Sequence, residues 1–170
     1  MSKNRSFFLL CLCASVAILL SPIKSFSQPD STKRKSIFFE LAGSGGIASI
    51  NYEKEFNKKN NTAFTWRAGF SIAPIDKNNG VGLVFPLMVN ALIGKNAHKI
   101  EFGLGQGITI TTKLHVFFLT TAAIGYRYQR EDKHWFYRVT YTPLISYLAD
   151  FQVQQWAGLS IGYTFNTATK

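Results

Sequence analysis

Cysteine is almost absent from this 170-residue chain, and its two copies, Cys11 and Cys13, lie inside one apolar run near the N-terminus. If that run is removed on export, the remaining chain has no thiol, which excludes a disulfide framework, a thiolate metal site and a cysteine nucleophile. The three histidines, His98, His115 and His134, have no partner at metal-ligand spacing. We therefore expect no metal and no other cofactor.

Acidic residues and helical patterns are also scarce. Nineteen lysine and arginine residues stand against nine aspartate and glutamate residues, for a net charge of +10. A basic balance can indicate nucleic-acid binding, but no basic helix is present and the chain begins with an export signal, so nucleic acid is not an expected partner. No apolar stripe repeats at helical spacing. Aromatic, β-branched and glycine residues dominate instead, which predicts strands.

The first 27 residues have the pattern of a secretory signal peptide. Lys3 and Arg5 give a positive start, residues 7–20 form an uncharged apolar run, and small residues precede the expected cleavage after Ser27. A transmembrane anchor is the alternative. The apolar run is shorter than the ~20 residues that a spanning helix needs, which favours the cleaved signal.

The rest of the chain divides into a disordered leader over residues 28–35, one domain over residues 36–165 and a C-terminal tail over residues 166–170. Turn signals separate eight segments of the domain, in most of which apolar and polar residues alternate. We predict strands over residues 36–43, 46–56, 62–73, 81–93, 98–110, 116–128, 135–146 and 157–165.

Two of these strands have alternatives, and the loops have expected bounds. Residues 36–56 could form one long strand, which would make the strand count odd. Residues 81–93 could form a short helix, although Pro86 and the β-branched content favour a strand. Residues 74–80 and 147–154 are expected to be loops.

Alternation is clearest in the last predicted strand, from Ala157 to Phe165. Every odd position there is apolar or aromatic, and every even position is glycine, serine or threonine. Because side chains alternate faces along a strand, one face is apolar and the other is small and polar. Such strands, even in number, build antiparallel barrels in bacterial outer membranes. We therefore predict an all-β, up-and-down transmembrane β-barrel of eight strands, closed by pairing of residues 157–165 with residues 36–43.

Aromatic residues support this topology. If both chain ends of the barrel face the periplasm, ten aromatic side chains gather at the periplasmic ends of their strands and share the outward parity. Tyrosine and tryptophan prefer the membrane–water interface. We call this predicted set the aromatic rim; it consists of Tyr52, Phe56, Phe64, Trp66, Tyr126, Tyr128, Trp135, Tyr137, Tyr163 and Phe165.

Charged residues of both signs fall on the inward parity. An eight-stranded barrel has an interior just wide enough for its own side chains, so charges there must pair or be hydrated. We predict a structural network of ion pairs that plugs the lumen; a gated polar path and a small-ligand site are the alternatives. We call this predicted set the lumen cluster; it consists of Glu40, Glu53, Arg67, Glu101, Arg127 and Arg138.

The chain resembles small bacterial outer-membrane proteins of the outer membrane protein beta-barrel domain type. The resemblance is carried by residues 39–43, 49–53, 67–70, 101–105, 124–128 and 158–165. It implies insertion by the barrel-assembly machinery, which reads a closing strand that ends in an aromatic residue. Here that residue is Phe165, and five residues follow it. The family shares no catalytic residues, so the resemblance implies none.

These observations predict a membrane protein with a structural or surface-interaction role and no enzymatic activity. Its expected partners are outer-membrane lipids and lipopolysaccharide, and its oligomeric state is open. A lipid A-modifying enzyme is one alternative, but His115 is the only histidine predicted on the outer side and no serine follows it two residues later. A soluble periplasmic ligand-binding β-barrel is the other alternative.

Overall fold

The structure is a computed structural model that describes residues 33–76, 80–146 and 152–165. The predicted signal peptide over residues 1–27, the first five residues of the predicted leader and the tail over residues 166–170 lie outside the described residues. Within the described ranges, no helix is long and apolar enough to cross a membrane.

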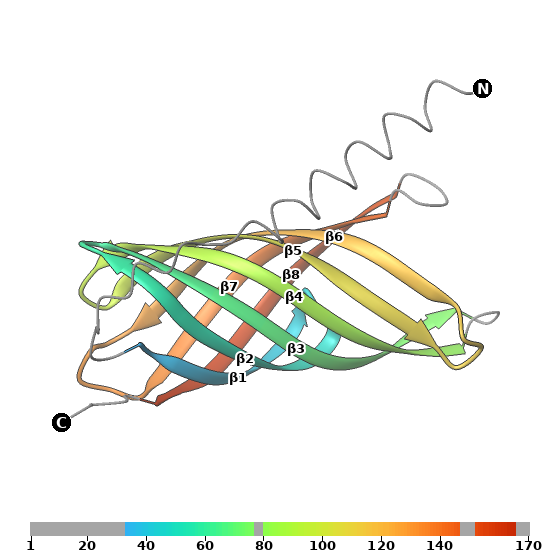
Figure 1. The fold of residues 1–170 in the computed structure, drawn as a ribbon, viewed down its shortest axis with the longest axis horizontal. Helices are drawn as coiled ribbons and strands as arrows, with labels where there is room; N and C mark the ends of the chain where they lie inside the picture. Colours follow the sequence, from blue (N-terminus) through green and yellow to red (C-terminus); the bar gives the residue numbers. More distant parts are fainter. Residues whose placement is uncertain (1–32, 77–79, 147–151, 166–170) are drawn as a thin grey trace, which may run out of the picture. The chain divides into compact units, whose positions relative to one another are not determined.

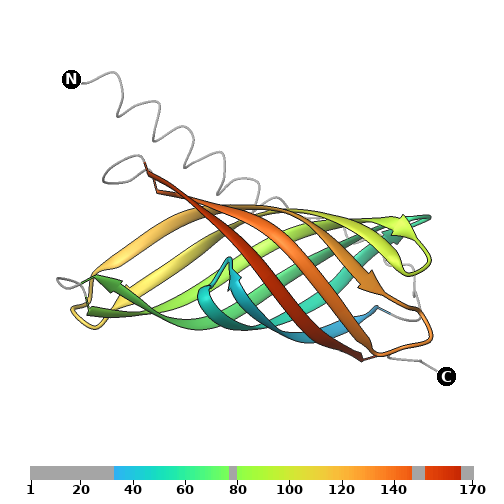
Figure 2. The ribbon, with the colours of Figure 1, turned by 180° about the vertical axis from the view of Figure 1, so that it is seen from behind.

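Eight antiparallel strands close into one barrel (Figures 1 and 2). Each strand pairs with its neighbours in sequence, and β8 closes the ring against β1 from Phe165↔Lys35 to Leu159↔Leu41. The predicted fold class, strand number and closing pair are therefore confirmed. The strands are β1 (Lys35–Gly43), β2 (Gly46–Lys59), β3 (Thr62–Asp76), β4 (Gly80–Lys95), β5 (His98–Thr111), β6 (Val116–Gln129), β7 (Trp135–Ser146) and β8 (Gln152–Phe165).

Both open alternatives are settled in favour of eight strands. The chain turns between Gly43 and Gly46, which pair with each other, so residues 36–56 do not form one long strand. Residues 80–95 are strand β4, and no helix forms there. Inward-facing Asn90 is only 1% exposed. Pro86 pairs across β4 and β5 with Gly107.

Every strand except β7 extends beyond its predicted bounds. β1 begins at Lys35, so the prediction of a disordered leader was wrong for that residue. β8 and β3 extend into predicted loops. β8 begins at Gln152, so the loop prediction was wrong for residues 152–154. Glutamines occupy three of the first four positions of β8 and hide the alternation, while pairing of Gln152 with Ser146 extends the strand. β3 continues through Pro74 to Asp76. Proline lacks a backbone N–H and is tolerated there because this end of β3 has no partner on its β2 side.

That free edge exists because the β1–β2 hairpin is short. β2 pairs with β3 only from Ser49↔Ser71 onward, and β1 pairs with β8 only as far as Leu41↔Leu159. Figure 2 shows the hairpin ending partway along the barrel. These unpaired edges lie away from the end of the barrel where β1 begins and β8 ends, which we call the termini end.

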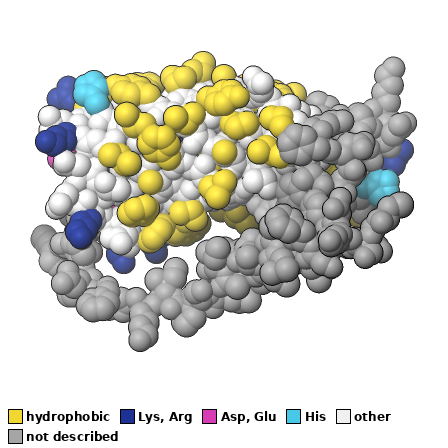
Figure 3. All heavy atoms as spheres, turned by 90° about the horizontal axis from the view of Figure 1, so that it is seen from above, with side chains coloured by type: hydrophobic (Ala, Val, Ile, Leu, Met, Phe, Trp, Pro, Cys, Tyr) yellow, Lys and Arg dark blue, Asp and Glu magenta, His cyan; other side chains and the backbone are white. Residues whose placement is uncertain are grey.

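The barrel has the reverse of a soluble protein's polarity. Outward-facing Leu104 is 65% exposed, Ile50 is 61% exposed and Leu159 is 59% exposed. The arginines of β3, β6 and β7 are at most 2% exposed. Hydrophobic side chains cover the middle of the wall, while lysines and arginines gather at the termini end, on the left of Figure 3. Contiguous apolar surface on this scale marks a contact with lipid or protein.

Candidate functional site

The interior of the barrel brings together all six residues of the lumen cluster. They come from six different strands: β1, β2, β3, β5, β6 and β7. Each side chain is at most 3% exposed. Side chains alternate faces along a strand, so a charged residue at inward parity has no route to solvent except along the lumen.

The cluster forms one continuous chain of alternating charge. Glu53 and Arg127 make a two-pronged contact at 2.7 and 2.9 Å. Arg127 lies 3.3 Å from Glu101, and Arg138 donates to Glu101 at 3.0 Å.

The second half of the chain centres on Glu40. Arg138 donates to Glu40 at 2.7 Å, and Arg67 ends the series at 3.4 Å from the same carboxylate. Three positive and three negative groups alternate along the series, so the buried charge cancels.

Hydroxyl groups add hydrogen bonds to Glu40 and Arg138. Ser44 donates to Glu40 at 3.1 Å, and Ser49 donates to it at 3.4 Å. Ser160 accepts hydrogen bonds from Arg138 at 3.1 and 3.3 Å. Charge-assisted hydrogen bonds of this kind are stronger than neutral ones, and buried ions need them to offset desolvation.

Two aromatic rings inside the lumen were missed by the sequence analysis. Phe38 and Phe136 are buried and meet edge to face, with ring centroids 5.8 Å apart. The guanidinium of Arg138 lies 4.3 Å from the Phe38 ring centre, and that of Arg127 lies 4.5 Å from the Phe136 ring centre. These cation–π contacts pack apolar surface against the ion pairs. The lumen is therefore filled by rings as well as by charges.

Gly162 makes room for these rings. It pairs with Phe38 on one side and with Phe136 on the other. A Cβ atom built at Gly162 would lie 2.4 Å from the Phe136 ring. The inward parity of both phenylalanines was visible in the sequence, but their meeting across a glycine required the register.

The members of the predicted aromatic rim lie on the outer wall toward the termini end, at least partly exposed. Several touch in pairs across neighbouring strands. Tyr52 and Trp66 have ring centroids 5.5 Å apart, and Phe56 and Phe64 are 6.3 Å apart. Trp135 and Tyr163 are 5.6 Å apart. Phe165, Tyr126, Tyr128 and Tyr137 are exposed on the same wall.

Two histidines, expected near this end as ordinary polar residues, contact the rings of the rim. His134 stacks on Tyr163 with ring centroids 5.1 Å apart, and His98 contacts the rings of Tyr126 and Tyr128. His115 lies near the other end of the barrel, 6.4 Å from Phe117 between ring centroids. Among the described residues, no group of three or more histidine, cysteine, aspartate or glutamate side chains could hold a metal ion.

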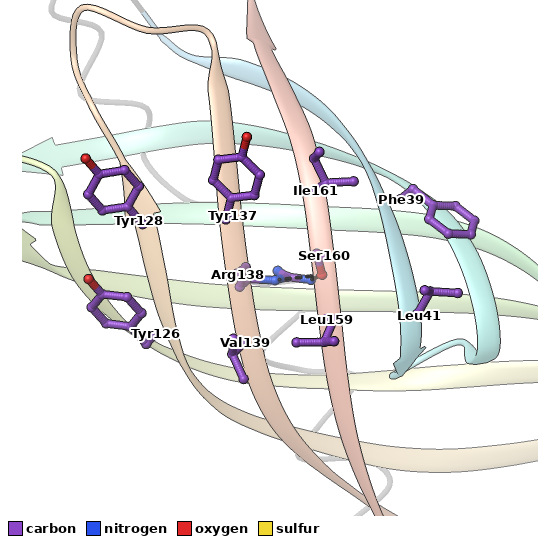
Figure 4. A pocket seen from close by; sticks show the side chains of 10 residues that line it. All are labelled: Phe39, Leu41, Tyr126, Tyr128, Tyr137, Arg138, Val139, Leu159, Ser160 and Ile161. Carbon is purple, nitrogen blue, oxygen red and sulfur yellow. Dashed lines mark hydrogen bonds between the residues drawn. The ribbon is translucent and has the colours of Figure 1, made fainter.

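An apolar groove of about 300 Å³ lies on the outer wall across β1, β6, β7 and β8. In Figure 4, Phe39, Leu41, Val139, Leu159 and Ile161 point outward around it, and the rim tyrosines flank one side. Its lining is almost wholly apolar, which suits hydrocarbon better than a polar ligand.

The closed ring of eight strands, with paired charges inside and apolar side chains outside, decides the fold. The fold is that of an eight-stranded transmembrane β-barrel. The N-terminal β-barrel domain of Pseudomonas aeruginosa OprF is similar, with 11% identity, a TM-score of 0.57 and coverage of 81% of this chain and 100% of that domain. The Yersinia pestis outer membrane protein Ail is similar too, with 12% identity, a TM-score of 0.54 and coverage of 80% and 100%. No family model and no curated protein sequence matches the chain.

Proposed function

We propose that the chain is an exported, integral outer-membrane β-barrel with a structural or surface-interaction role rather than an enzymatic one. The observation that carries the proposal is the inverted polarity of the barrel: its charges are paired inside, and its apolar side chains face out. A soluble ligand-binding barrel would need the opposite arrangement.

The apolar wall has the height that a bilayer needs. On β4 the outward residues from Val81 to Ile93 are all apolar. Twelve steps of about 3.3 Å make a row of about 40 Å. With a tilt of about 40°, that row rises about 30 Å, which matches the hydrocarbon thickness of a membrane. Ail, of the same fold, is described as an outer membrane protein in a phospholipid bilayer nanodisc.

The lumen cluster supports a closed barrel rather than a channel. Its alternating charges leave no net charge to attract ions of one sign, and Phe38 and Phe136 fill space beside them. An eight-stranded barrel has little room to spare. We propose that the cluster plugs the lumen and holds the strands in register.

An even strand number brings both ends of the barrel to the same side. Because an exported chain reaches the outer membrane from the periplasm, we propose that the termini end lies at the periplasmic face. The partners that this position supports are outer-membrane lipids, lipopolysaccharide at the opposite face, and the barrel-assembly machinery acting on the closing strand that ends at Phe165. The signal peptide over residues 1–27 belongs to the same proposal.

The test uses the full chain in two arms. Cell fractionation should place it in detergent-extracted outer membrane, with heat-modifiable migration on a gel; recovery in the soluble periplasmic fraction would contradict the membrane assignment. Purified protein inserted in a planar lipid bilayer should show no steady conductance. A stable open channel would overturn the plugged lumen while leaving the membrane assignment intact.

A further inference from the structure

The positive charge of the barrel is concentrated at its termini end. Ten lysine or arginine residues gather there, against three carboxylates. The lumen cluster is neutral, and the described residues of the opposite end include one lysine, Lys113, and one aspartate, Asp76. The basic residues are Lys33, Arg34, Lys35, Lys54, Lys58, Lys59, Lys95, Lys99, Arg130 and Lys133; the carboxylates are Glu55, Glu131 and Asp132.

Two of these lysines face each other directly. Lys35 on β1 is the cross-strand partner of Lys54 on β2. Lys35 shares the outward parity of Ile37, and Lys54 shares that of Tyr52. Like charges directly opposite each other destabilise a sheet, and neither lysine forms an ion pair with a carboxylate in the described part of the chain. An anion between the two ammonium groups would remove this repulsion.

Aromatic residues flank the lysine pair within the same cross-strand row. Phe165 pairs with Lys35, and Trp66 pairs with Lys54. Tryptophan at this level belongs to the membrane–water interface, where lipid headgroups lie. The lysine pair is therefore at the depth of headgroup phosphates.

An apolar groove begins directly beside the pair, on the side away from the termini end. It has a volume of about 260 Å³ and is lined on the outer wall by Ile37, Ile50, Tyr52, Ala68 and Phe70. Its floor is low because the small Ala68 lies between Trp66 and Phe70 along β3 and is the cross-strand partner of Tyr52. No lysine lines the groove itself, but its Ile37–Tyr52 pair is the next outward-facing cross-strand pair along from Lys35–Lys54.

We infer that this part of the wall is a binding site for one anionic phospholipid. Lys35 and Lys54 hold the phosphate, Tyr52 and Trp66 bracket the headgroup region, and one acyl chain lies in the groove over Ala68. The inference rests on the proposed function, because the orientation proposed there puts the site in the periplasmic leaflet.

The test is native mass spectrometry of the full chain released from nanodiscs that contain phosphatidylcholine and phosphatidylglycerol. The wild-type barrel should retain one phosphatidylglycerol in preference to phosphatidylcholine. Lys35→Gln or Lys54→Gln should reduce that preference roughly fivefold, and the double variant about 30-fold, as expected for loss of one or two lysines near an anionic surface. Lys54→Arg should keep most of it.

Matched controls separate this site from the general basic surface. Lys58 lies on the same strand but opposite Ala63, so Lys58→Gln should leave the retained lipid unchanged. Ala68→Leu fills the groove and should also abolish retention, whereas Ala91→Leu, outward on β4 beyond the groove, should not.

Each contrary result has a definite meaning. Equal loss in the Lys58 and Lys54 variants, or no preference in the wild type, overturns the site. Displacement of the retained lipid by inorganic phosphate alone would identify a free-anion site and also overturn it. Insertion is checked in the same samples by heat-modifiable migration. A barrel that does not insert contradicts the proposed function, whereas one that inserts without lipid preference contradicts only this inference.

Discussion

The same eight strands present two opposite chemistries. On β7 and β8, Arg138 and Ser160 face a lumen in which they are hydrogen-bonded and buried, while Val139 and Leu159, one residue along, are more than half exposed on the wall. The lumen is stabilised by contacts within the chain. In the proposed function, the wall is stabilised by burial in lipid. Substitutions on the two faces should therefore respond to different features of the surroundings.

Loss of one charge from the lumen should have the largest effect. Glu101 contacts both Arg138 and Arg127, so Glu101→Gln leaves two buried guanidinium groups short of a partner. We expect a cost of about 3–5 kcal/mol in the free energy of unfolding, measured by urea titration in lipid vesicles. Ser160→Ala removes only a hydroxyl acceptor of Arg138 and should cost about 1.5–3 kcal/mol. Equal stability of Glu101→Gln and the wild type would show that the cluster does not hold the barrel.

A charge placed on the wall should have the next largest effect. Leu159→Arg puts a cation near the bilayer midplane and should cost about 2–4 kcal/mol in lipid vesicles. Ile93, which is also outward-facing, lies two residues from Lys95 near the interface. Ile93→Arg should cost only about 0–1 kcal/mol. If both variants refold into vesicles equally well, the cost of a charge on the wall does not depend on its depth, and the wall does not face lipid.

A single methyl group in the lumen should have the smallest effect of the three. Gly162→Ala pushes a Cβ against the Phe136 ring and should cost about 1–3 kcal/mol through overpacking. Gly107→Ala is the control, because the nearest atoms to its Cβ would lie 3.8 Å and 4.0 Å away. Thermal unfolding in the same detergent compares the two. A Gly107 variant that is destabilised as much as the Gly162 variant would argue against close packing at the two phenylalanines.

The strands, and the face of the barrel to which each side chain points, could be predicted from the sequence because both depend on local spacing. Alternation over two residues placed Arg127 inside and Tyr126 outside without any knowledge of neighbouring strands. The two wrong loop predictions, at the start of β8 and the end of β3, also have local causes. The glutamines at the start of β8 conceal the alternation, and Pro74 is compatible with β3 only because the β1–β2 hairpin stops short of it.

The partners of the charged residues could not be predicted in the same way. Glu53 and Arg127 are 74 positions apart and meet across the lumen, which no sequence spacing reveals. Phe38 has the inward parity, but its contact with Phe136 depends on the glycine between β1 and β7. The pairing of Lys35 with Lys54 depends on the turn at residues 43–46, because a shift of one residue would change every cross-strand partner.

The sequence by itself determined an eight-stranded barrel with an apolar wall and a charged interior, because side-chain direction along a strand has a period of two residues. The tertiary structure decided which charges neutralise one another, how two phenylalanines fill the lumen and where two lysines oppose each other beside a groove. Those outcomes depend on the closure of the barrel and the register of its strands. Both bring together residues that are far apart in the chain, and their contacts cannot be predicted from that separation.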